Sequence, residues 1–447
     1  MQIEIPVNVQ KIINTLEENG YEAYAVGGCI RDSVLGRTPN DWDITTSALP
    51  NQTKALFAHT FDTGIKHGTI SVLLGKTVYE VTTYRIDGEY EDSRHPKDVV
   101  FTPDLKEDLR RRDFTINAMA YNPKVGLVDI FGGLEDLRNH MIRAVGNAEE
   151  RFTEDALRIL RAVRFAAQLG FDIDDGTKAA IRKLAPNLSH ISAERICAEL
   201  LKLLESDHPM LLRTAWELGI TKIVLPEFDT MMDTVQNNPH HCYTVGEHTL
   251  RVIEGVRPDR VLRLSALLHD VGKPACRTTD EDGIDHFHHH PAVGKEMAVG
   301  IMKRLKLDND TIAKVSRLVC YHDYKPEPNA HSMRRAINKI GEDAFPDIFE
   351  LILADINGQS KFEYEAKLEY RQKIMDIYCE IMDSHQCLSI KSLAITGRDL
   401  IEMGIEPGPA LGRMLDDILE KVLENPELNT RQQLLDYVKG LSSDEKC

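Results

Sequence analysis

The stretch at 26–46 constrains the fold of this chain more than any other part of it. An apolar run at 23–26 leads directly into Gly27 and Gly28. This indicates a buried strand that ends where two residues without side chains let a ligand approach the backbone. Arg31 follows within one helical turn and can pair with phosphate oxygens, and a glycine turn that enters a helix favours an anion. The turn therefore predicts a triphosphate site.

Two acidic residues follow this turn. Asp41 and Asp43 flank Trp42 in an alternating segment, so a strand here would direct both carboxylates to one face. Two hard oxygen ligands suit Mg²⁺. A calcium loop is disfavoured because it needs further oxygen ligands, a glycine and a distal glutamate, which the residues at 44–46 do not supply. A lone glycine pair or a lone Asp-x-Asp usually marks a turn or a solvated loop, but here the elements occur together and in order.

The order G-G-x-x-R-D, L-G, D-x-D in this stretch resembles the head-domain signature of class II tRNA nucleotidyltransferases and of the bacterial poly(A) polymerases related to them. The resemblance implies an α+β fold, with a small mixed-sheet, polymerase β-like head followed by all-α regions. It also implies that Gly27, Gly28 and Arg31 bind the nucleotide and that Asp41 and Asp43 are the catalytic residues that hold Mg²⁺.

Composition limits the class of protein. At 447 residues, 42% of them apolar, the chain can form about three domains with proper cores. No run approaches the roughly 18 apolar residues of a membrane span and no signal-peptide pattern is present, so we expect a cytoplasmic protein. Eight cysteines without a C-x-x-C predict neither a disulfide framework nor a thiolate zinc site. The net charge of −17 argues against nonspecific coating of nucleic acid, so RNA contacts require local basic faces.

The rest of the head is expected to complete a small mixed sheet. The pattern predicts an amphipathic helix over 1–22 and a hairpin of strands at 70–74 and 77–83. Glu80, in the second of these strands, could be a third metal carboxylate. An exposed strand glutamate is at least as common, and Glu80 is left out of the predicted site.

The segment 86–104 is polar and is broken by Gly88, Pro96 and Pro103, which predicts a long loop. Loops of this length in compact domains are uncommon and often functional. The resemblance places here a flexible loop that helps the site change from C to A addition. Its presence favours an enzyme that can add A.

The next motif, D-L-R-R-R-D-F-T-I-N-A-M-A, covers residues 108–120. Three arginines before an acid could be no more than a solvated helix end. The string from Arg111 to Ala118 is nevertheless among the most specific motifs of the resembled family, in which its Arg-Asp pair contacts the nucleotide and its ribose. The resemblance therefore implies that Arg112 and Asp113 contact the nucleotide and its ribose in this protein.

A helix is predicted over 154–166, where arginines recur every third residue. The resemblance places the nucleotide-selecting helix here, and the spacing of three would set Asp155 and Arg158 on one helix face, an acceptor beside a donor. Cytosine and adenine both present an amino group next to an unprotonated ring nitrogen, whereas uracil and guanine would be mismatched. Arg161 and Arg164, further along the face, would reach the triphosphate or the tRNA backbone. A solvated arginine face is the alternative.

After residue 240 the sequence becomes rich in histidine, and adjacent His-Asp after an apolar helix is hard to explain as core alone. The pattern H…HD…D resembles the HD phosphohydrolase superfamily, in which imidazole and carboxylate ligands suit Ni²⁺, Mn²⁺ or Zn²⁺. His288 and His289 are interpreted as bystanders, because the family spacing selects the next histidine. The predicted metal ligands are His248, His269, Asp270, His290, His322 and Asp355.

We therefore predict four regions: a nucleotidyltransferase head (1–137), a helical neck (138–230), an HD region (231–360) and a helical, tRNA-binding tail (361–447). The expected activity is template-independent addition of CCA to the 3′ end of tRNA from CTP and ATP, with a second phosphohydrolase site. A poly(A) polymerase or an enzyme adding only part of CCA remains an alternative. So does a metal phosphohydrolase whose head only senses nucleotide. The sequence does not indicate an oligomeric state.

Overall fold

The computed structural model describes residues 2–87 and 99–444. They form two compact units, one of residues 1–229 with 304–307 and the other of residues 230–303 with 308–447. The division falls close to the predicted boundary between neck and HD region. The further boundaries at 137 and 360 stay predictions.

A seven-stranded sheet forms the centre of the first unit, in the order β3-β4-β5-β2-β1-β8-β9. Its strands are β1 (Ala23–Val26), β2 (Asp43–Thr46), β3 (Thr60–Gly64), β4 (Thr69–Leu74), β5 (Thr77–Thr83), β8 (Met119–Asn122) and β9 (Gly126–Asp129). Strands β2 and β5 pair in parallel, and the other neighbours pair antiparallel. The predicted mixed sheet and α+β class are confirmed.

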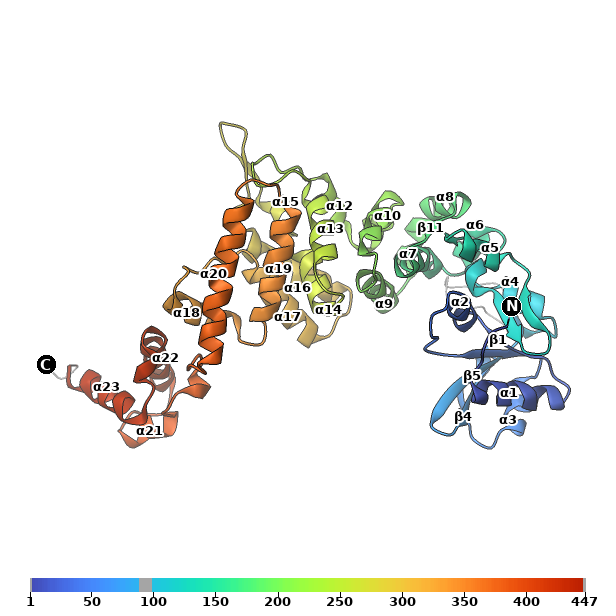
Figure 1. Cartoon of the computed structure of the whole chain (residues 1–447), viewed down its shortest axis with the longest axis horizontal. Coiled ribbons are helices and arrows are strands. Elements are labelled where there is room, and N and C mark those ends of the chain that lie inside the picture. Colours follow the sequence, from blue (N-terminus) through green and yellow to red (C-terminus); the bar gives the residue numbers. More distant parts are fainter. Residues whose placement is uncertain (1, 88–98, 445–447) are drawn as a thin grey trace. The chain divides into compact units, whose positions relative to one another are not determined.

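Helices α1 (Val7–Glu18) and α3 (Pro50–Leu56) pack against this sheet and against each other (Figure 1). The amphipathic pattern predicted over 1–22 places Ile12, Ile13 and Leu16 on the buried face of α1, where all three are fully buried. Burial of such side chains stabilises the unit by about 2 kcal/mol each. The helix anchors β1, which leads into the glycine turn.

The segment predicted as one long loop at 86–104 is only partly irregular, so that prediction was wrong at its flanks. Strands β6 (Arg85–Asp87) and β7 (Val99–Phe101) pair antiparallel, because Ile86, Val99 and Val100 are β-branched residues outside the Gly and Pro positions. The intervening residues 88–98 lie outside the described residues, and the proposed change from C to A addition falls on them.

Helices make up most of the remaining chain. The neck contains α6 (Ala148–Glu154), α7 (Leu157–Leu169), α8 (Asp175–Leu184) and α9 (Ala193–Leu204). The second unit contains α13 (Val245–Gly255), α14 (Arg260–Leu268), α16 (His290–Arg304), α17 (Asn309–Tyr321), α19 (Phe345–Gly358) and α20 (Tyr364–Asp383). These are followed by α21 (Gly397–Glu402), α22 (Pro409–Glu424) and α23 (Arg431–Asp444) (Figure 1). In this unit α13 packs on α19 and α14 packs on α17. None of the helices described is long and apolar enough to cross a membrane.

Candidate functional sites

The glycine turn after β1 holds a close contact that a side chain would prevent. Gly27 has φ +84°, and a Cβ atom there would lie 3.0 Å from Nη1 of Arg112. Glycine tolerates this left-handed backbone and leaves room for the guanidinium. The turn therefore brings Arg112, from the motif predicted to contact nucleotide, to the start of α2 (Gly28–Val34).

The carboxylates of Asp41 and Asp43 are electrostatic neighbours, although only Asp43 belongs to β2. The expectation that both lie on one strand was wrong, because the strand begins at Asp43. Burial raises the pKa of Asp43, nearby Asp41 raises it further, and Arg112 partly offsets both effects. The two carboxylates thus repel each other beside one guanidinium.

Glu80 is a third member of this acidic group. In the parallel pairing of β2 with β5, Ile44 lies opposite Val81, which brings Glu80 next to Asp43. The pKa of Glu80 is raised by burial and then by Asp43 and Asp41. A divalent cation would relieve the repulsion among three carboxylates, although in this structure their oxygens are not gathered at the spacing of one ion's ligands. Sequence reasoning left Glu80 out because the signal is the register of two strands, which the sequence does not display.

A chain of hydrogen bonds links the head to α7. Arg31 donates to Asn117 Oδ1 at 2.7 Å, and Asn117 donates to Asp113 Oδ1 at 3.0 Å. The other oxygen of Asp113 accepts from Nε and Nη2 of Arg161 at 2.9 and 2.7 Å. Burial alone would raise the pKa of Asp113, but Arg161 and Asn117 outweigh it and hold this pKa well below its ordinary value. Asn117 lies within the quoted motif but was not predicted as a site residue.

Each of the three arginines of α7 has an acidic partner: Arg158 pairs with Glu154, Arg161 with Asp113 and Arg164 with Glu199. Arg164 pairs with Glu199 of α9 at 2.8 Å, and both are buried. Its guanidinium carbon lies 3.5 Å from the centre of the Phe165 ring, with Arg31 and Arg161 at 5.1 and 5.2 Å. Guanidinium groups are attracted to aromatic rings. Arg164 is therefore committed to packing and ion pairing in this structure.

Asp155 and Arg158 do not lie on one helix face, and that prediction was wrong. Asp155 follows the end of α6 and precedes α7; its carboxylate accepts from Leu157 N at 3.0 Å and Arg195 Nη2 at 2.8 Å. Arg158 instead donates to Glu154 at 2.7 Å and to the carbonyl of Arg111 at 2.8 Å. Their backbones are in contact, since the Arg158 N–H donates a hydrogen bond to the carbonyl of Asp155 at 3.0 Å.

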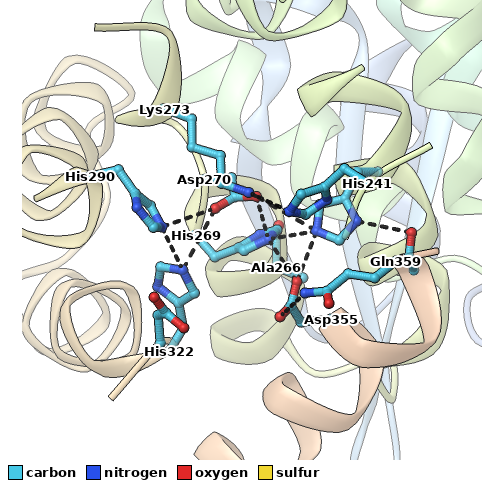
Figure 2. A network of polar contacts seen from close by, with 12 residues as sticks. His241, Ala266, His269, Asp270, Lys273, His290, His322, Asp355 and Gln359 are labelled. Atoms are coloured by element: carbon cyan, nitrogen blue, oxygen red, sulfur yellow. Dashed lines mark hydrogen bonds and ion pairs between the residues drawn. The ribbon is translucent and has the colours of Figure 1, made fainter. Parts of the chain in front are cut away.

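The second unit brings all six predicted metal ligands together (Figure 2). They come from the first turn of α13, the two residues that follow α14, the first residue of α16, the residue that follows α17 and the last turn of α19. The four histidines and Asp270 are buried. His248, His269 and Asp270 form one group with closely spaced ligand atoms, and Asp270, His290 and His322 form another.

Each histidine of the cluster is held in the same way. The Nδ1 atoms of His248, His269, His290 and His322 lie 3.1, 2.8, 2.8 and 2.7 Å from the backbone carbonyls of residues 358, 266, 287 and 319. A carbonyl only accepts, so each Nδ1 carries a proton and each Nε2 is the ring atom that a metal ion would take. All four Nε2 atoms face the carboxylates of Asp270 and Asp355. This donor set fits a transition metal.

Lys273 and His241 adjoin the cluster and were not predicted. The Lys273 ammonium lies 2.7 Å from Asp270 Oδ2 and 3.0 Å from Gln236 Oε1. Burial, with Lys273 nearby, lowers the pKa of His241 to about 3, so this imidazole is neutral at neutral pH. The sequence does contain a signal for Lys273, which stands three residues after Asp270. Their contact with the cluster depends on tertiary packing.

A cavity of about 610 Å³ opens beside the cluster. Lys273, Lys325 and Lys367 line it together with His286 and His288. The His286 and His288 rings stack with centroids 5.6 Å apart, and neither residue belongs to the two ligand groups found among the described residues. The carboxylates Asp270, Asp285, Asp323, Asp355 and Glu363 line it as well, and the cavity gives a small molecule access to the buried histidines.

Three family models match separate parts of the chain. The Poly A polymerase head domain matches residues 23–143, the "Probable RNA and SrmB-binding site of polymerase A" matches 170–232, and tRNA nucleotidyltransferase domain 2 matches 278–438. A CCA-adding enzyme of Lacticaseibacillus paracasei is 35% identical over 97% of this chain and 96% of its own length. One from Leuconostoc mesenteroides is 53% identical over 98% and 97%. The chain belongs to the CCA-adding enzyme family.

The solved CCA-adding enzyme of Bacillus stearothermophilus in complex with CTP is 30% identical, with a TM-score of 0.72, and the match covers 98% of each chain. The family models include the acidic group of the head. They do not include residues 233–277, which contain His248, His269 and Asp270. The histidine cluster of this CCA-adding family member is therefore identified by its own geometry.

Proposed function

We propose that the protein adds C, C and A to the 3′ end of tRNA, using CTP and ATP. The acidic group of Asp41, Asp43 and Glu80 beside Arg112 is the observation that carries this proposal. The names of its relatives support it, and so does the similar enzyme solved with CTP. We expect this activity in the cytoplasm.

In this mechanism Asp41 and Asp43 would hold Mg²⁺, with Glu80 completing the acidic group. Bound Mg²⁺ supplies positive charge that stabilises the developing charge on the transferred phosphoryl group. Gly27 and Gly28 let the triphosphate approach the backbone, and Arg31 and Arg112 neutralise its oxygens. The tRNA 3′-hydroxyl attacks the α-phosphorus, the bond to the β-phosphate oxygen breaks, and pyrophosphate leaves.

Choice of base is assigned to Asp155 and Arg158. Their present partners, Arg195 and Glu154, occupy the polar atoms that a base would need. Binding of a base with an amino donor beside an unprotonated nitrogen would exchange these contacts for equivalent ones. Uracil would leave polar groups unpaired at a cost of about 1–3 kcal/mol each. Asp113, Arg161 and Arg164 hold the surrounding arginines and aromatic ring in place.

Replacing Asp41 by Ala tests the head. Transfer of CMP to tRNA should fall by about 10³-fold or more, the equivalent of the several kcal/mol that a metal supplies. Asp62→Ala removes another acidic side chain of the head, 47% exposed and paired with Lys54, and should leave transfer unchanged. Normal transfer by Asp41→Ala, measured with radiolabelled CTP, would overturn the assignment.

We further propose that the histidine cluster is a metal-dependent phosphohydrolase site. Four oriented Nε2 atoms, two carboxylates and a lysine-lined cavity support this proposal. A transition metal bound there would activate water against a phosphoester. Lys273 and Lys367 line the path by which the anion would enter.

Loss of the cluster should separate the two activities. A His269→Ala/Asp270→Ala variant should lose hydrolysis of bis(p-nitrophenyl) phosphate in Ni²⁺ or Mn²⁺ by about 10³-fold, while its CCA addition remains. His288→Ala, a cavity histidine outside the cluster, serves as the matched control. Unchanged hydrolysis in the double variant would eliminate the phosphohydrolase.

A poly(A) polymerase, or an enzyme that adds only A, is the second candidate. The head model that matches residues 23–143 is described as that of poly(A) polymerase. The products made on tRNA distinguish these activities.

A further inference from the structure

We infer that Asp108 is a positioning residue of the nucleotide site in the head, and that it holds the guanidinium of Arg112 at the glycine turn. Asp108 lies on α4 (Leu105–Arg110), at the start of the arginine motif, and its side chain is fully buried. The inference rests on the proposed function only in that the head binds a nucleoside triphosphate. It follows from the partners that surround one buried carboxylate.

Each oxygen of Asp108 has more than one partner. Oδ1 accepts hydrogen bonds from Nε and Nη2 of Arg111 at 3.0 and 2.8 Å and from the backbone N–H of Arg85 at 3.3 Å. Oδ2 accepts one from Thr45 Oγ1 at 3.0 Å and lies 3.7 Å from Nη2 of Arg112. Burial alone would raise the pKa of Asp108, but Arg111 and Arg112 outweigh it and lower this pKa. The carboxylate is therefore a charged centre inside the head.

These partners come from three separate parts of the head. Thr45 stands two residues after Asp43 on β2, so both side chains lie on one face of that strand. Arg85 is the first residue of β6, and Arg111 and Arg112 follow α4. One carboxylate thus links the strand of a proposed catalytic residue to an arginine proposed to neutralise the triphosphate.

Arg112 is placed between this carboxylate and the glycine turn. Its Nη1 atom lies against the position that a Cβ of Gly27 would take, and its Nη2 atom faces Asp108. Within the part of the chain that the structure describes, Asp108 is the residue with which Arg112 forms an ion pair, and the buried Nε of Arg112 has no hydrogen-bond partner. The guanidinium is thus held from one side and keeps a donor for an anionic ligand.

A second carboxylate competes for the same guanidinium. Burial lowers the pKa of Arg112, and Asp108 offsets this effect more strongly than Asp43 does. Without the charge of Asp108, Asp43 becomes the strongest attraction left for Arg112. A guanidinium drawn to Asp43 would leave the glycine turn and would neutralise a carboxylate proposed to hold Mg²⁺. A role of Asp108 in folding alone predicts instead a loss of stability with unchanged nucleotide affinity.

Equilibrium binding of CTP to the full-length protein tests the inference, in Mg²⁺ and without tRNA, so that no transfer takes place. Asp108→Asn keeps the shape of the side chain and removes its charge. The dissociation constant for CTP should rise about 10-fold, because a charge-assisted contact of Arg112 with the triphosphate is lost. This contact does not involve the base, so the affinity for ATP should fall by the same factor.

A double-mutant cycle shows whether Asp108 acts through Arg112. Arg112→Ala should also weaken CTP binding, and adding Asp108→Asn to it should change the affinity by less than about 2-fold. Unchanged or tighter binding of CTP by Asp108→Asn would overturn the inference. So would a loss of about 10-fold when Asp108→Asn is added to Arg112→Ala.

Thr45→Val is a second, milder variant, since it removes one hydrogen bond to Asp108 and leaves every charge in place. The dissociation constant for CTP should rise about 3-fold in the wild-type background and stay unchanged in Arg112→Ala. An equal loss in both backgrounds would contradict an action through Arg112.

Asp285→Asn is the matched control, because Asp285 is also fully buried and has the same kinds of partner. Its carboxylate pairs with Arg277 at 3.0 Å and accepts from Asn237 N at 2.8 Å and Thr279 Oγ1 at 2.7 Å. This variant should keep the CTP affinity of the wild type, and thermal unfolding shows that each variant is folded.

The same measurements separate this inference from the proposed function. A wild-type protein that binds no CTP would overturn both. CTP binding that depends on Asp108 in a protein that adds nothing to tRNA would overturn only the proposed function.

Discussion

At the residue scale, Asp113 shows how burial and pairing together set a charge state. Its carboxylate is 9% exposed and receives two hydrogen bonds from Arg161 and one from Asn117. Without this acceptor the partly buried Arg161 guanidinium would lose its nearest partner, since Glu199 lies 3.6 Å away. The carboxylate therefore stabilises the junction between head and α7.

This pairing predicts a pH dependence of stability. Folding lowers the pKa of Asp113. The contribution of this carboxylate to the free energy of unfolding is therefore complete when the pH is above its pKa in the unfolded chain, about 3.9, and is lost as the pH falls below that value. Asp113→Asn should lower the free energy of unfolding by about 2 kcal/mol at pH 7. The difference from the wild type should shrink between pH 4 and the acid limit. Urea unfolding at a series of pH values measures it.

The control for this prediction is Asp175→Asn, which changes a fully exposed carboxylate that lies 3.9 Å from Lys178. It should change stability little at any pH. A constant difference between Asp113→Asn and the wild type from pH 7 to pH 3 would contradict the predicted linkage.

The types of side chain proposed for both sites could be predicted from the sequence, because each residue type has a known chemistry. The histidines of the cluster were identified by the resemblance of the pattern H…HD…D to the HD superfamily, and the structure brings them together. Glu80 was missed because its place beside Asp43 depends on strand register. Lys273 and Asn117 were missed although their acidic partners, Asp270 and Asp113, stand only three and four residues away, because such spacing is equally common at exposed positions outside any site.

At the scale of the element, α7 shows the limit of a periodic pattern. The regular arginines over 154–166 predict one helix, but the structure ends α6 at Glu154 and begins α7 at Leu157. Asp155 breaks the pattern because its carboxylate bonds to Leu157 N and Arg195 instead of lying on a helix face. Periodicity records which side chains are apolar and does not record this local competition.

The start of α7 carries the prediction on base choice. Arg158→Lys keeps the charge but removes the planar fork that bonds to Glu154 and Arg111. The preference for CTP over UTP should fall by about 10-fold. This corresponds to the lower end of the cost of about 1–3 kcal/mol for a buried polar group left unpaired. Competition of labelled CTP and UTP on one tRNA measures it.

Arg182→Lys, at an exposed position on α8, makes the same chemical change outside the site and should leave the preference unchanged. Wild-type discrimination in Arg158→Lys would show that Asp155 and Arg158 do not select the base.

At the scale of the whole molecule, each of the two compact units contains one of the two proposed metal sites. Carboxylates beside arginines suit Mg²⁺ and a triphosphate in the first, and imidazoles suit a transition metal in the second. The α+β class and the helical character of the later regions followed from the resemblance to class II tRNA nucleotidyltransferases. The paired strands at 85–87 and 99–101 did not, because short β-branched runs beside Gly and Pro resemble loops.

The products formed on tRNA test the central claim most directly. The wild-type protein is incubated with tRNA lacking its CCA end, Mg²⁺ and labelled CTP and ATP, and the 3′ ends are sequenced. The account predicts three additions, C, C and A, after which extension stops. Long A tracts, addition of A alone to ends that lack CC, or no addition at all would contradict it.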